Sequence, residues 1–281
     1  MEIKIENISF WYMSKRRKVL EDFSLQLQPD NIIGLIGRNG QGKTTLMNLI
    51  AGKFEPDEGI IEIGGKNPAT DIGTAKRIVY VAGVMSYSEI KLKKIIEEYR
   101  LMYEKFDEEF AHKLMELFGL NKKAKIKNLS KGQETIFNFC CGMATRADIT
   151  ILDEPVSGVD AISRNKIYEI ILRDYIEHPR TILISSHMLG EMEKILSHMI
   201  MIGNNDVLFA GDIEELKDSV YRVDGELANI EQALIADSTG TVIGGILGTS
   251  TVTSFVSIFF DIFIDTITPS SVYGFSILSV L

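Results

Sequence analysis

The stretch GRNGQGKTT, residues 37–45, restricts the fold of this chain more than any other part of the sequence. It directly follows the apolar run IIGLI, and the segment after it predicts a helix. Glycines let the backbone turn tightly enough for successive N–H groups to point inward, and the positive end of the following helix adds to them. A buried strand, a glycine-rich loop and a helix in this order predict a cage for phosphate oxygens, which we call the phosphate loop.

Two side chains at the end of the phosphate loop supply its ligand chemistry. Lys43 is predicted to neutralise the outer phosphates of a nucleotide, and the Thr44 hydroxyl to bind the magnesium ion that travels with them. The alternative is a glycine-rich turn without a ligand, but the flanking strand and helix favour a phosphate site. We expect nucleotide contacts from Gly37, Arg38, Asn39, Gly40, Gln41, Gly42, Lys43, Thr44 and Thr45.

The run ITILDEP, residues 149–155, predicts the acidic part of the same site. Its apolar residues predict a strand buried on both faces, and its carboxyl end, where open α/β sheets bind ligands, carries Asp153 and Glu154. We predict that Asp153 holds magnesium directly or through water, and that Glu154 acts as general base on the attacking water. Taken alone, two acids after a strand are equally well explained by an exposed turn. The phosphate loop in the same chain favours the catalytic interpretation.

A second candidate anion site is LSKGQ, residues 129–133, which directly precedes the helical segment ETIFNFCCGMATR. Ser130 and Gly132 can present a hydroxyl and backbone N–H groups at a helix N-terminus. The alternative is an ordinary N-cap in which Ser130 caps its own helix. Two phosphate-binding helix starts in one chain suggest a nucleotide held between two chains.

The order of the predicted elements indicates an α/β fold. Short apolar strands at residues 149–153, 181–186 and 199–203 alternate with helical segments, which favours a parallel sheet with crossover helices. The first sixty-odd residues alternate as antiparallel strands around the strand, loop and helix of the phosphate loop. Residues 88–123 carry apolar side chains at three- and four-residue spacing, which predicts a helical insertion.

Composition excludes some partners and sites. A net charge of −9 and a pI near 5.1 provide no basic field for a nucleic-acid backbone, so nucleic acid is not an expected partner. Cys140 and Cys141, the only cysteines, are adjacent inside an apolar segment. They are predicted to be core residues rather than a disulfide or metal ligands.

Taken in order, these motifs resemble the ATP-binding subunits of ABC transporters over about residues 1–222. GRNGQGKTT is similar to the Walker A loop of that family, LSKGQ to its signature sequence and ILDEP to its Walker B strand. SGVD, ending at Asp160, resembles the D-loop, and ISSH, ending at His187, resembles the switch-histidine segment. The resemblance implies a P-loop NTPase core with an antiparallel β subdomain and a helical subdomain at about residues 88–145.

The resemblance also implies roles for individual residues and partners. Tyr12 would stack on adenine, with Trp11 as its rival and core packing as the alternative for both, and His187 would contact the terminal phosphate. The signature residues Ser130, Lys131, Gly132 and Gln133 would cap ATP bound to a second ATP-binding subunit, in a homodimer or a heterodimer. Closure of this dimer over ATP and Mg²⁺ would drive polytopic membrane subunits docked on the helical subdomain. This places the chain as a peripheral protein on the cytoplasmic face of the cell membrane.

Two departures from the family pattern bear on function. Gly83 stands where the family has a glutamine that touches magnesium and water, so that contact is missing or comes from a neighbour such as Ser86. Lys131 replaces the usual second-position glycine of the signature. LSKGQ and HPRT, residues 178–181, are similar to segments of drug, peptide and antibiotic-type exporters. The alternatives are a soluble ABC ATPase acting on ribosomes or DNA, and a regulator that binds ATP but hydrolyses it little.

Residues 223–281 form an atypical tail rich in apolar residues, Gly, Ser and Thr. Residues 242–260 carry no charge and as a helix would span about 28 Å, against roughly 30 Å of bilayer hydrocarbon. Asp261 and Asp265 follow, each costing roughly 2.5 to 3.5 kcal/mol at mid-membrane. Spanning the membrane, lying at its interface and disorder are all open alternatives. Residues 233–255 resemble a membrane segment of guanine/hypoxanthine-type nucleobase permeases, which suggests an ATPase domain joined to a permease fragment by gene fusion or a sequence-assembly fault.

Overall fold

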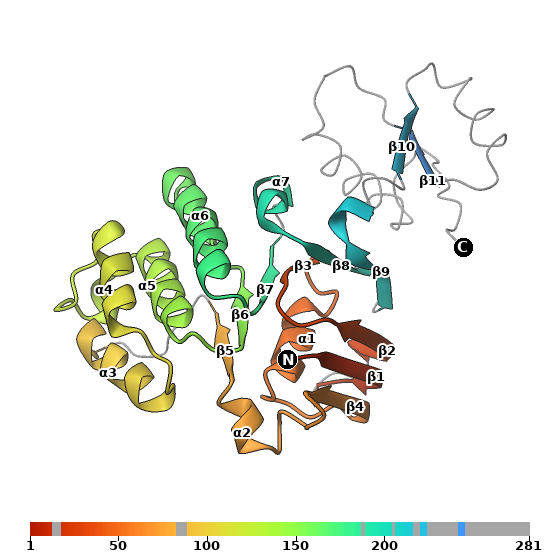
Figure 1. Ribbon diagram of the computed structural model, residues 1–281, viewed down its shortest axis with the longest axis horizontal. Helices are drawn as coiled ribbons and strands as arrows, with labels where there is room; N and C mark the ends of the chain where they lie inside the picture. The colour runs from red at the N-terminus through yellow and green to blue at the C-terminus, as the bar shows by residue number, and fades with distance from the viewer. Residues whose placement is uncertain are drawn as a thin grey trace. The chain divides into compact units, whose positions relative to one another are not determined.

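The computed structural model describes residues 1–12, 18–82, 89–186, 189–203, 206–215, 220–223 and 241–244. The chain divides into two compact units (Figure 1). The first contains Met1–His187 and Ile195–Ala210, and the second contains Met188–Lys194 and Gly211–Leu281. Every described residue of the predicted nucleotide site belongs to the first unit.

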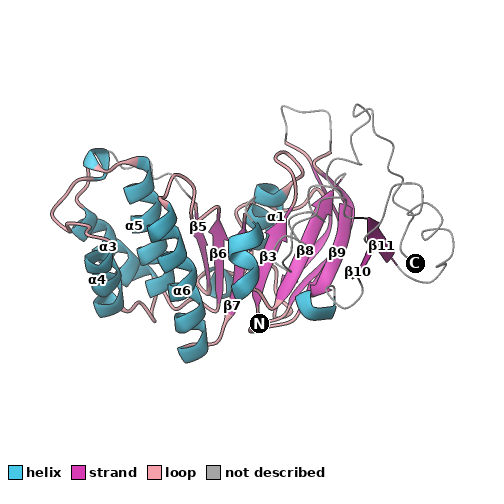
Figure 2. Cartoon of the chain, turned by 90° about the horizontal axis from the view of Figure 1, so that it is seen from above, coloured by secondary structure: helices cyan, strands magenta, loops and turns pink. Residues whose placement is uncertain are grey.

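The centre of the first unit is a six-stranded sheet in the order β5-β6-β7-β3-β8-β9. The strands are β3 (Ile32–Ile36), β5 (Ile78–Val81), β6 (Ile149–Asp153), β7 (Thr181–Ser185), β8 (His198–Gly203) and β9 (Asp206–Asp212). β3 pairs in parallel with β7 and β8, and β6 with β5 and β7. All residues of β3 and β7 are buried, as the apolar runs predict for strands covered on both faces. Figure 2 shows the six strands side by side.

A second, antiparallel sheet is built from β1 (Ile3–Phe10), β2 (Leu20–Leu27) and β4 (Glu58–Ile63) in the order β2-β1-β4. Ile3 lies opposite Leu27 on one side and Ile63 on the other, and all three side chains are buried. Buried and exposed residues alternate along β2 because only one face of the sheet meets the core. The predicted antiparallel layer is confirmed.

Three helices gather at the β5 side of the central sheet. They are α3 (Leu92–Met102), α4 (Glu108–Leu117) and α5 (Lys131–Ala144), with the short 3₁₀ helix η1 (Ile126–Asn128) before α5. They lie on the opposite side of the unit from the antiparallel sheet (Figure 1). Asp107 caps α4 by accepting a hydrogen bond from the Phe110 N–H at 2.8 Å. The predicted fold class, an α/β core with an antiparallel sheet and a helical region, is confirmed.

Three further helices of the first unit connect or precede strands of the central sheet. α1 (Lys43–Ile50) follows the phosphate loop, α2 (Ile72–Ala75) precedes β5, and α6 (Ala161–Glu177) joins β6 to β7. In α6, Ile167 and Ile171 are fully buried while Ile162 and Ile176 near its ends are exposed. The parallel crossover predicted between residues 153 and 181 is therefore present.

The second unit contains α7 (Leu189–Met192) and the first residues of the 3₁₀ helix η2 (Glu193–Ile195). In it β10 (Val220–Val223) pairs in parallel with β11 (Thr241–Gly244). Residues 242–244, which a membrane-spanning helix over 242–260 would include, are therefore extended. The rest of that apolar run lies outside the described residues. No helix in the described part of the chain is long and apolar enough to cross a membrane.

Candidate functional site

The phosphate loop connects β3 to α1, as the sequence predicts. Gly40 and Gly42 have φ values of 84° and 97°, in the region that residues with a Cβ rarely adopt. A Cβ on Gly37 would lie 2.5 Å from the carbonyl oxygen of Ile202 in β8, so only glycine fits there. Gly42 is also the N-cap of α1 and has no side chain to cap the helix. The first amides of α1 are therefore available to an anion.

Lys43 lies against the loop that it is predicted to serve. Its Nζ donates hydrogen bonds to the carbonyl oxygens of Gly37 and Arg38, the second at 3.1 Å. Burial lowers the pKa of Lys43, and the nearby carboxylates of Glu154 and Asp153 oppose that shift. The ammonium group thus lies inside the loop, where it is hydrogen-bonded to carbonyl oxygens. A bound phosphate would offer it a full negative charge in place of these carbonyl dipoles.

Asp153 is the centre of a hydroxyl cluster at the carboxyl end of β6. Its Oδ2 accepts hydrogen bonds from Thr44 Oγ1 at 3.0 Å and from the Tyr80 hydroxyl at 2.7 Å. Its Oδ1 accepts one from Ser185 Oγ at 2.6 Å. The fold therefore joins the predicted magnesium ligands Thr44 and Asp153, which are far apart in the sequence. Our sequence interpretation missed Tyr80 and Ser185.

The donor set fits a magnesium ion carried by a nucleotide. Among the described residues, no group of three or more His, Cys, Asp and Glu side chains is placed to hold a metal. Mg²⁺ typically takes one or two carboxylates together with water and substrate phosphates rather than an all-protein cage. Asp153 and Thr44 supply one carboxylate and one hydroxyl beside the phosphate loop, which matches that preference.

Glu154 directly follows β6, at the point where the backbone turns out of the strand. Its φ of 49° is left-handed, a conformation that costs a non-glycine residue roughly 1–2 kcal/mol. Its N–H donates to Ser185 Oγ at 2.9 Å, and that hydroxyl also donates to Asp153. Ser185 in β7 thereby fixes the turn that separates the two acids.

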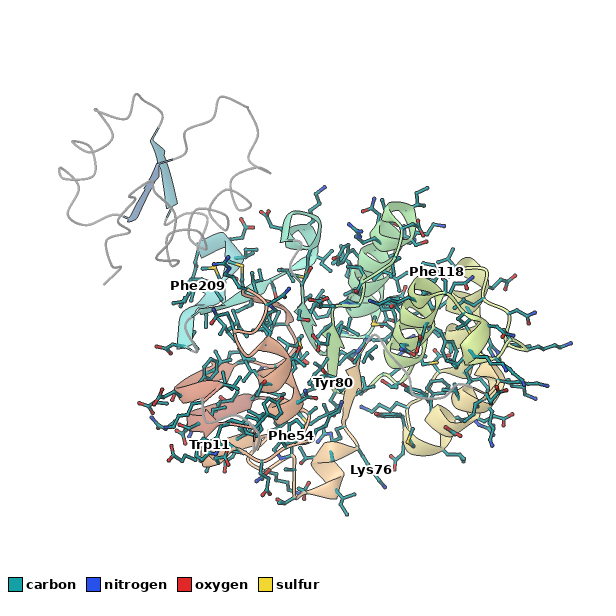
Figure 3. All side chains as sticks on the ribbon, turned by 180° about the vertical axis from the view of Figure 1, so that it is seen from behind. Trp11, Phe54, Lys76, Tyr80, Phe118 and Phe209 are labelled. Atoms are coloured by element: carbon teal, nitrogen blue, oxygen red, sulfur yellow. The ribbon has the colours of Figure 1, made fainter. Side chains whose placement is uncertain are left out.

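Tyr80 is held from both ends. Its hydroxyl donates to Asp153, and the Nζ of Lys53 lies 3.4 Å from the centroid of its ring. Burial, reinforced by the negative charge of Asp153, raises the pKa of Tyr80 far above its ordinary value, so the phenol stays a hydrogen-bond donor. Burial lowers the pKa of Lys53, and the Asp153 carboxylate opposes this. Figure 3 labels Tyr80, together with Phe54 and Trp11.

Comparison with known proteins identifies the family. A sequence model of the family described as ABC transporter matches residues 20–157. The ABC transporter ATP-binding protein YtrB of Bacillus subtilis (strain 168) is 30% identical over 207 residues, covering 73% of this chain and 71% of that protein. The chain belongs to the ATP-binding proteins of ABC transporters.

Two further matches agree with this family. The Nod factor export ATP-binding protein I of Burkholderia thailandensis (strain ATCC 700388 / DSM 13276 / CCUG 48851 / CIP 106301 / E264) is 28% identical over 212 residues, covering 71% of this chain and 69% of that protein. A solved ATP-binding subunit of an ABC transporter aligns with a TM-score of 0.70 at 23% identity, over 78% of this chain and 92% of that one. That structure shares the fold.

The signature segment of this ABC ATP-binding protein starts α5. Ser130 Oγ accepts a hydrogen bond from the Gln133 N–H at 3.2 Å, and Gln133 Oε1 accepts one from the Ser130 N–H at 3.0 Å. This reciprocal capping box is the ordinary N-cap that the sequence offered as the alternative. Lys131 is exposed at the first position of the helix. In a single chain the signature residues Ser130 and Gln133 cap the N-terminus of their own helix.

The signature and the D-loop touch within this one chain. A Cβ on Gly132 would lie 2.5 Å from the carbonyl oxygen of Gly158, and Thr135 Oγ1 donates to the carbonyl oxygen of Ser157 at 3.1 Å. Asp160 caps α6 by accepting from the Ser163 N–H at 3.0 Å, and this hydrogen bond lowers the pKa of Asp160. The close packing explains why glycine stands at position 132.

The aromatic residues near the ABC Walker A loop differ in their surroundings. The Tyr12 hydroxyl lies 3.3 Å from Thr45 Oγ1 in the loop. Trp11 instead has the ammonium of Lys18 over its ring, with Nζ 5.8 Å from the ring centroid. The Tyr12 ring also packs edge-on against Phe10 and Phe54 at centroid distances of 5.1 and 5.9 Å. Tyr12 as the adenine contact stays a prediction. Gly83, Ser86 and His187 lie outside the described residues.

Proposed function

We propose that this chain hydrolyses ATP and thereby drives an ABC exporter. The observation that carries the proposal is the hydrogen bond from Thr44 to Asp153, which joins the phosphate loop to the acidic end of β6. These are the two elements needed to hold a nucleotide and its metal side by side. When bound, Mg²⁺ would supply positive charge against the charge that develops on the transferred phosphoryl group.

The residues of the site have distinct proposed tasks. The amides at the start of α1 and the Lys43 ammonium bind the phosphates, and Thr44 and Asp153 hold the metal. Glu154, the acid that directly follows Asp153 in the Walker B segment, accepts the proton of the attacking water. His187 contacts the terminal phosphate, and Tyr12 contacts the adenine.

We further propose that catalysis needs a second ATP-binding subunit. The N-terminus of α5 would face the terminal phosphate of ATP held by the partner, with Ser130 and the amides of residues 131–133 as donors. The capping box supports this because it holds that helix start in a defined shape before the partner arrives. Closure over two nucleotides would move polytopic membrane subunits, with the helical region around α3 and α4 as their docking surface.

The exporter assignment and the cellular position rest on similarity. The segments LSKGQ and HPRT resemble those of drug, peptide and antibiotic-type exporters, and one relative is named for Nod factor export. A chain that drives membrane subunits in this way would work as a peripheral protein on the cytoplasmic face of the membrane. The genes adjacent to this one are searched first for a polytopic membrane protein, and ATPase activity measured together with such a protein tests the assignment. Stimulation by that partner supports a transporter subunit, whereas turnover that stays near zero with it favours the ATP-binding regulator suggested by Gly83.

We also propose that the ATP-binding domain ends near residue 222 and that residues 233–255 derive from a nucleobase permease. The support is the change of composition and the sequence resemblance of that segment. Sequencing the source locus with long reads tests the origin of the tail. An unbroken frame through Ala233 would reject a sequence-assembly fault.

The general-base assignment is tested by Glu154→Gln, which keeps the shape of the side chain and removes its charge. We expect ATP turnover to fall about 10²- to 10⁴-fold, the usual contribution of a general base, while ATP binding is retained. Glu177→Gln, at the exposed end of α6, is the matched control and should leave turnover unchanged. Equal turnover of the Glu154 variant and the wild type would remove Glu154 from the mechanism.

A further inference from the structure

We infer that Tyr80 positions Asp153 for the metal, an inference that rests on the proposed function of this site. Tyr80 belongs to β5 and lies outside the phosphate loop and the strand that carries the two acids. Its hydroxyl reaches the same Asp153 oxygen, Oδ2, that receives the Thr44 hydroxyl. A side chain from a third element thus holds the same carboxylate oxygen that contacts Thr44, the other predicted magnesium ligand.

The geometry fixes the carboxylate in one orientation. Oδ1 is held at 2.6 Å by Ser185 from β7, and Oδ2 at 2.7 Å by Tyr80 from β5, the two strands that flank β6 in the sheet. Hydrogen bonds from hydroxyls to an ionised carboxylate are shorter and stronger than neutral ones. Rotation of Asp153 away from Thr44 would break both, so the plane of the carboxylate is set before any ligand arrives.

The ring of Tyr80 is itself anchored. Lys53, just after the end of α1, places its Nζ 3.4 Å from the ring centroid. Thr44 belongs to the first turn of the same helix. The α1 segment therefore contacts the Tyr80–Asp153 pair at two points. Thr44, at the start of the helix, donates to Asp153, and Lys53, which follows the helix, lies over the Tyr80 ring. An ammonium over a tyrosine ring is attracted by the ring and is worth more when the pair is shielded from water.

Residues that orient metal ligands usually contribute about 10- to 100-fold to metal affinity, and this is the size of effect that we expect from Tyr80. The role is positioning, because the hydroxyl acts through Asp153. A positioning role predicts that removal of the Tyr80 hydroxyl lowers the affinity for the metal and for metal-bound ATP, but not the affinity for ATP alone. The phosphate loop, which grips ATP without the metal, keeps its own contacts.

The test is Tyr80→Phe, which deletes the hydroxyl and keeps the ring over which Lys53 lies. ATP affinity is measured with the full chain in magnesium and in EDTA, and Mn²⁺ affinity in the presence of ATP is measured by electron paramagnetic resonance. We expect Mn²⁺ to bind about 10- to 100-fold more weakly, with the ATP affinity in EDTA unchanged. Tyr175→Phe is the matched control, because that hydroxyl donates to the Asp30 carbonyl oxygen at 2.6 Å, beyond the other end of β3. It should alter neither affinity.

Each outcome decides between the claims. Mn²⁺ affinity equal to wild type in Tyr80→Phe overturns the positioning role while the proposed function stands. An equal loss of ATP affinity in EDTA and in magnesium also overturns it, since this would mark a general packing defect. Lys53→Met is a second variant that leaves the phenol intact, and we expect it to weaken Mn²⁺ binding less than Tyr80→Phe does. Wild-type protein whose ATP affinity does not respond to the metal would overturn the proposed function together with this inference.

Discussion

Helices α1 and α5 both begin at a predicted phosphate site, but their first turns are occupied differently. Gly42 caps α1 and has no side chain, while Ser130 caps α5 in a capping box with Gln133. The first amides of α1 therefore have no capping side chain from their N-cap residue, whereas one amide of α5 is already bonded within the chain. The difference supports our proposal that α1 binds the nucleotide of its own chain, and that α5 exchanges an internal bond for a phosphate only when a partner supplies one.

The largest expected effect is on the affinity of the single chain for ATP, which should depend on the start of α1 and not on the start of α5. Lys43→Ala removes charged hydrogen bonds at the α1 site, each typically worth about 1.5–3 kcal/mol, so ATP should bind about 10- to 100-fold more weakly to the single chain. Titration with a fluorescent ATP analogue measures this. Lys113→Ala, a surface lysine on α4 paired with Glu109, is the control. Unaltered affinity in the Lys43 variant would mean that α1 is not the primary site.

The second prediction concerns the packing that sets the α5 site. Gly132→Ala would place a methyl group 2.5 Å from the Gly158 carbonyl oxygen, and forced overpacking of this kind costs typically about 1–3 kcal/mol. Urea unfolding measures the loss. Gly190→Ala in α7, where a Cβ meets nothing within 4 Å, should lose far less. Equal stability of the Gly132 variant and the wild type would show that the D-loop moves to accommodate the methyl group at little cost in free energy.

The smallest effect tests the cap itself. Ser130→Ala should lower the free energy of unfolding by about 1 kcal/mol, because the N-cap acceptor is lost. Ser130→Asp keeps an acceptor and should retain stability, but its charge would repel a partner's phosphate and weaken ATP-dependent dimerisation. ATP binding to the single chain should be unaffected in both variants. A weaker single-chain affinity would contradict the division of labour between α1 and α5.

The contrast between local and distant contacts explains what the sequence could predict. The phosphate loop and the strand ending at Asp153 were predictable because each is a contiguous pattern of glycines or apolar residues followed by its functional side chains. Tyr80 and Ser185 were not, because they reach Asp153 only when β6 lies between β5 and β7. That strand order is set by packing between segments distant in the sequence.

The α5 site shows a related difficulty. The sequence LSKGQ predicts both an anion site and an ordinary cap, and a single chain displays the cap. The proposed phosphate contacts of the same atoms need a partner chain, which the sequence of one chain does not describe. The contact between Gly132 and Gly158 was likewise hidden, because it joins segments whose closeness depends on where α5 and the start of α6 lie in the fold.

The most direct test of the central claim is sedimentation velocity of the Glu154→Gln protein with and without magnesium and ATP. Two nucleotides held between α1 of one chain and α5 of the other should convert this variant to a dimer, and EDTA should return it to the monomer. Protein that binds ATP saturably yet stays monomeric at every concentration would contradict the account.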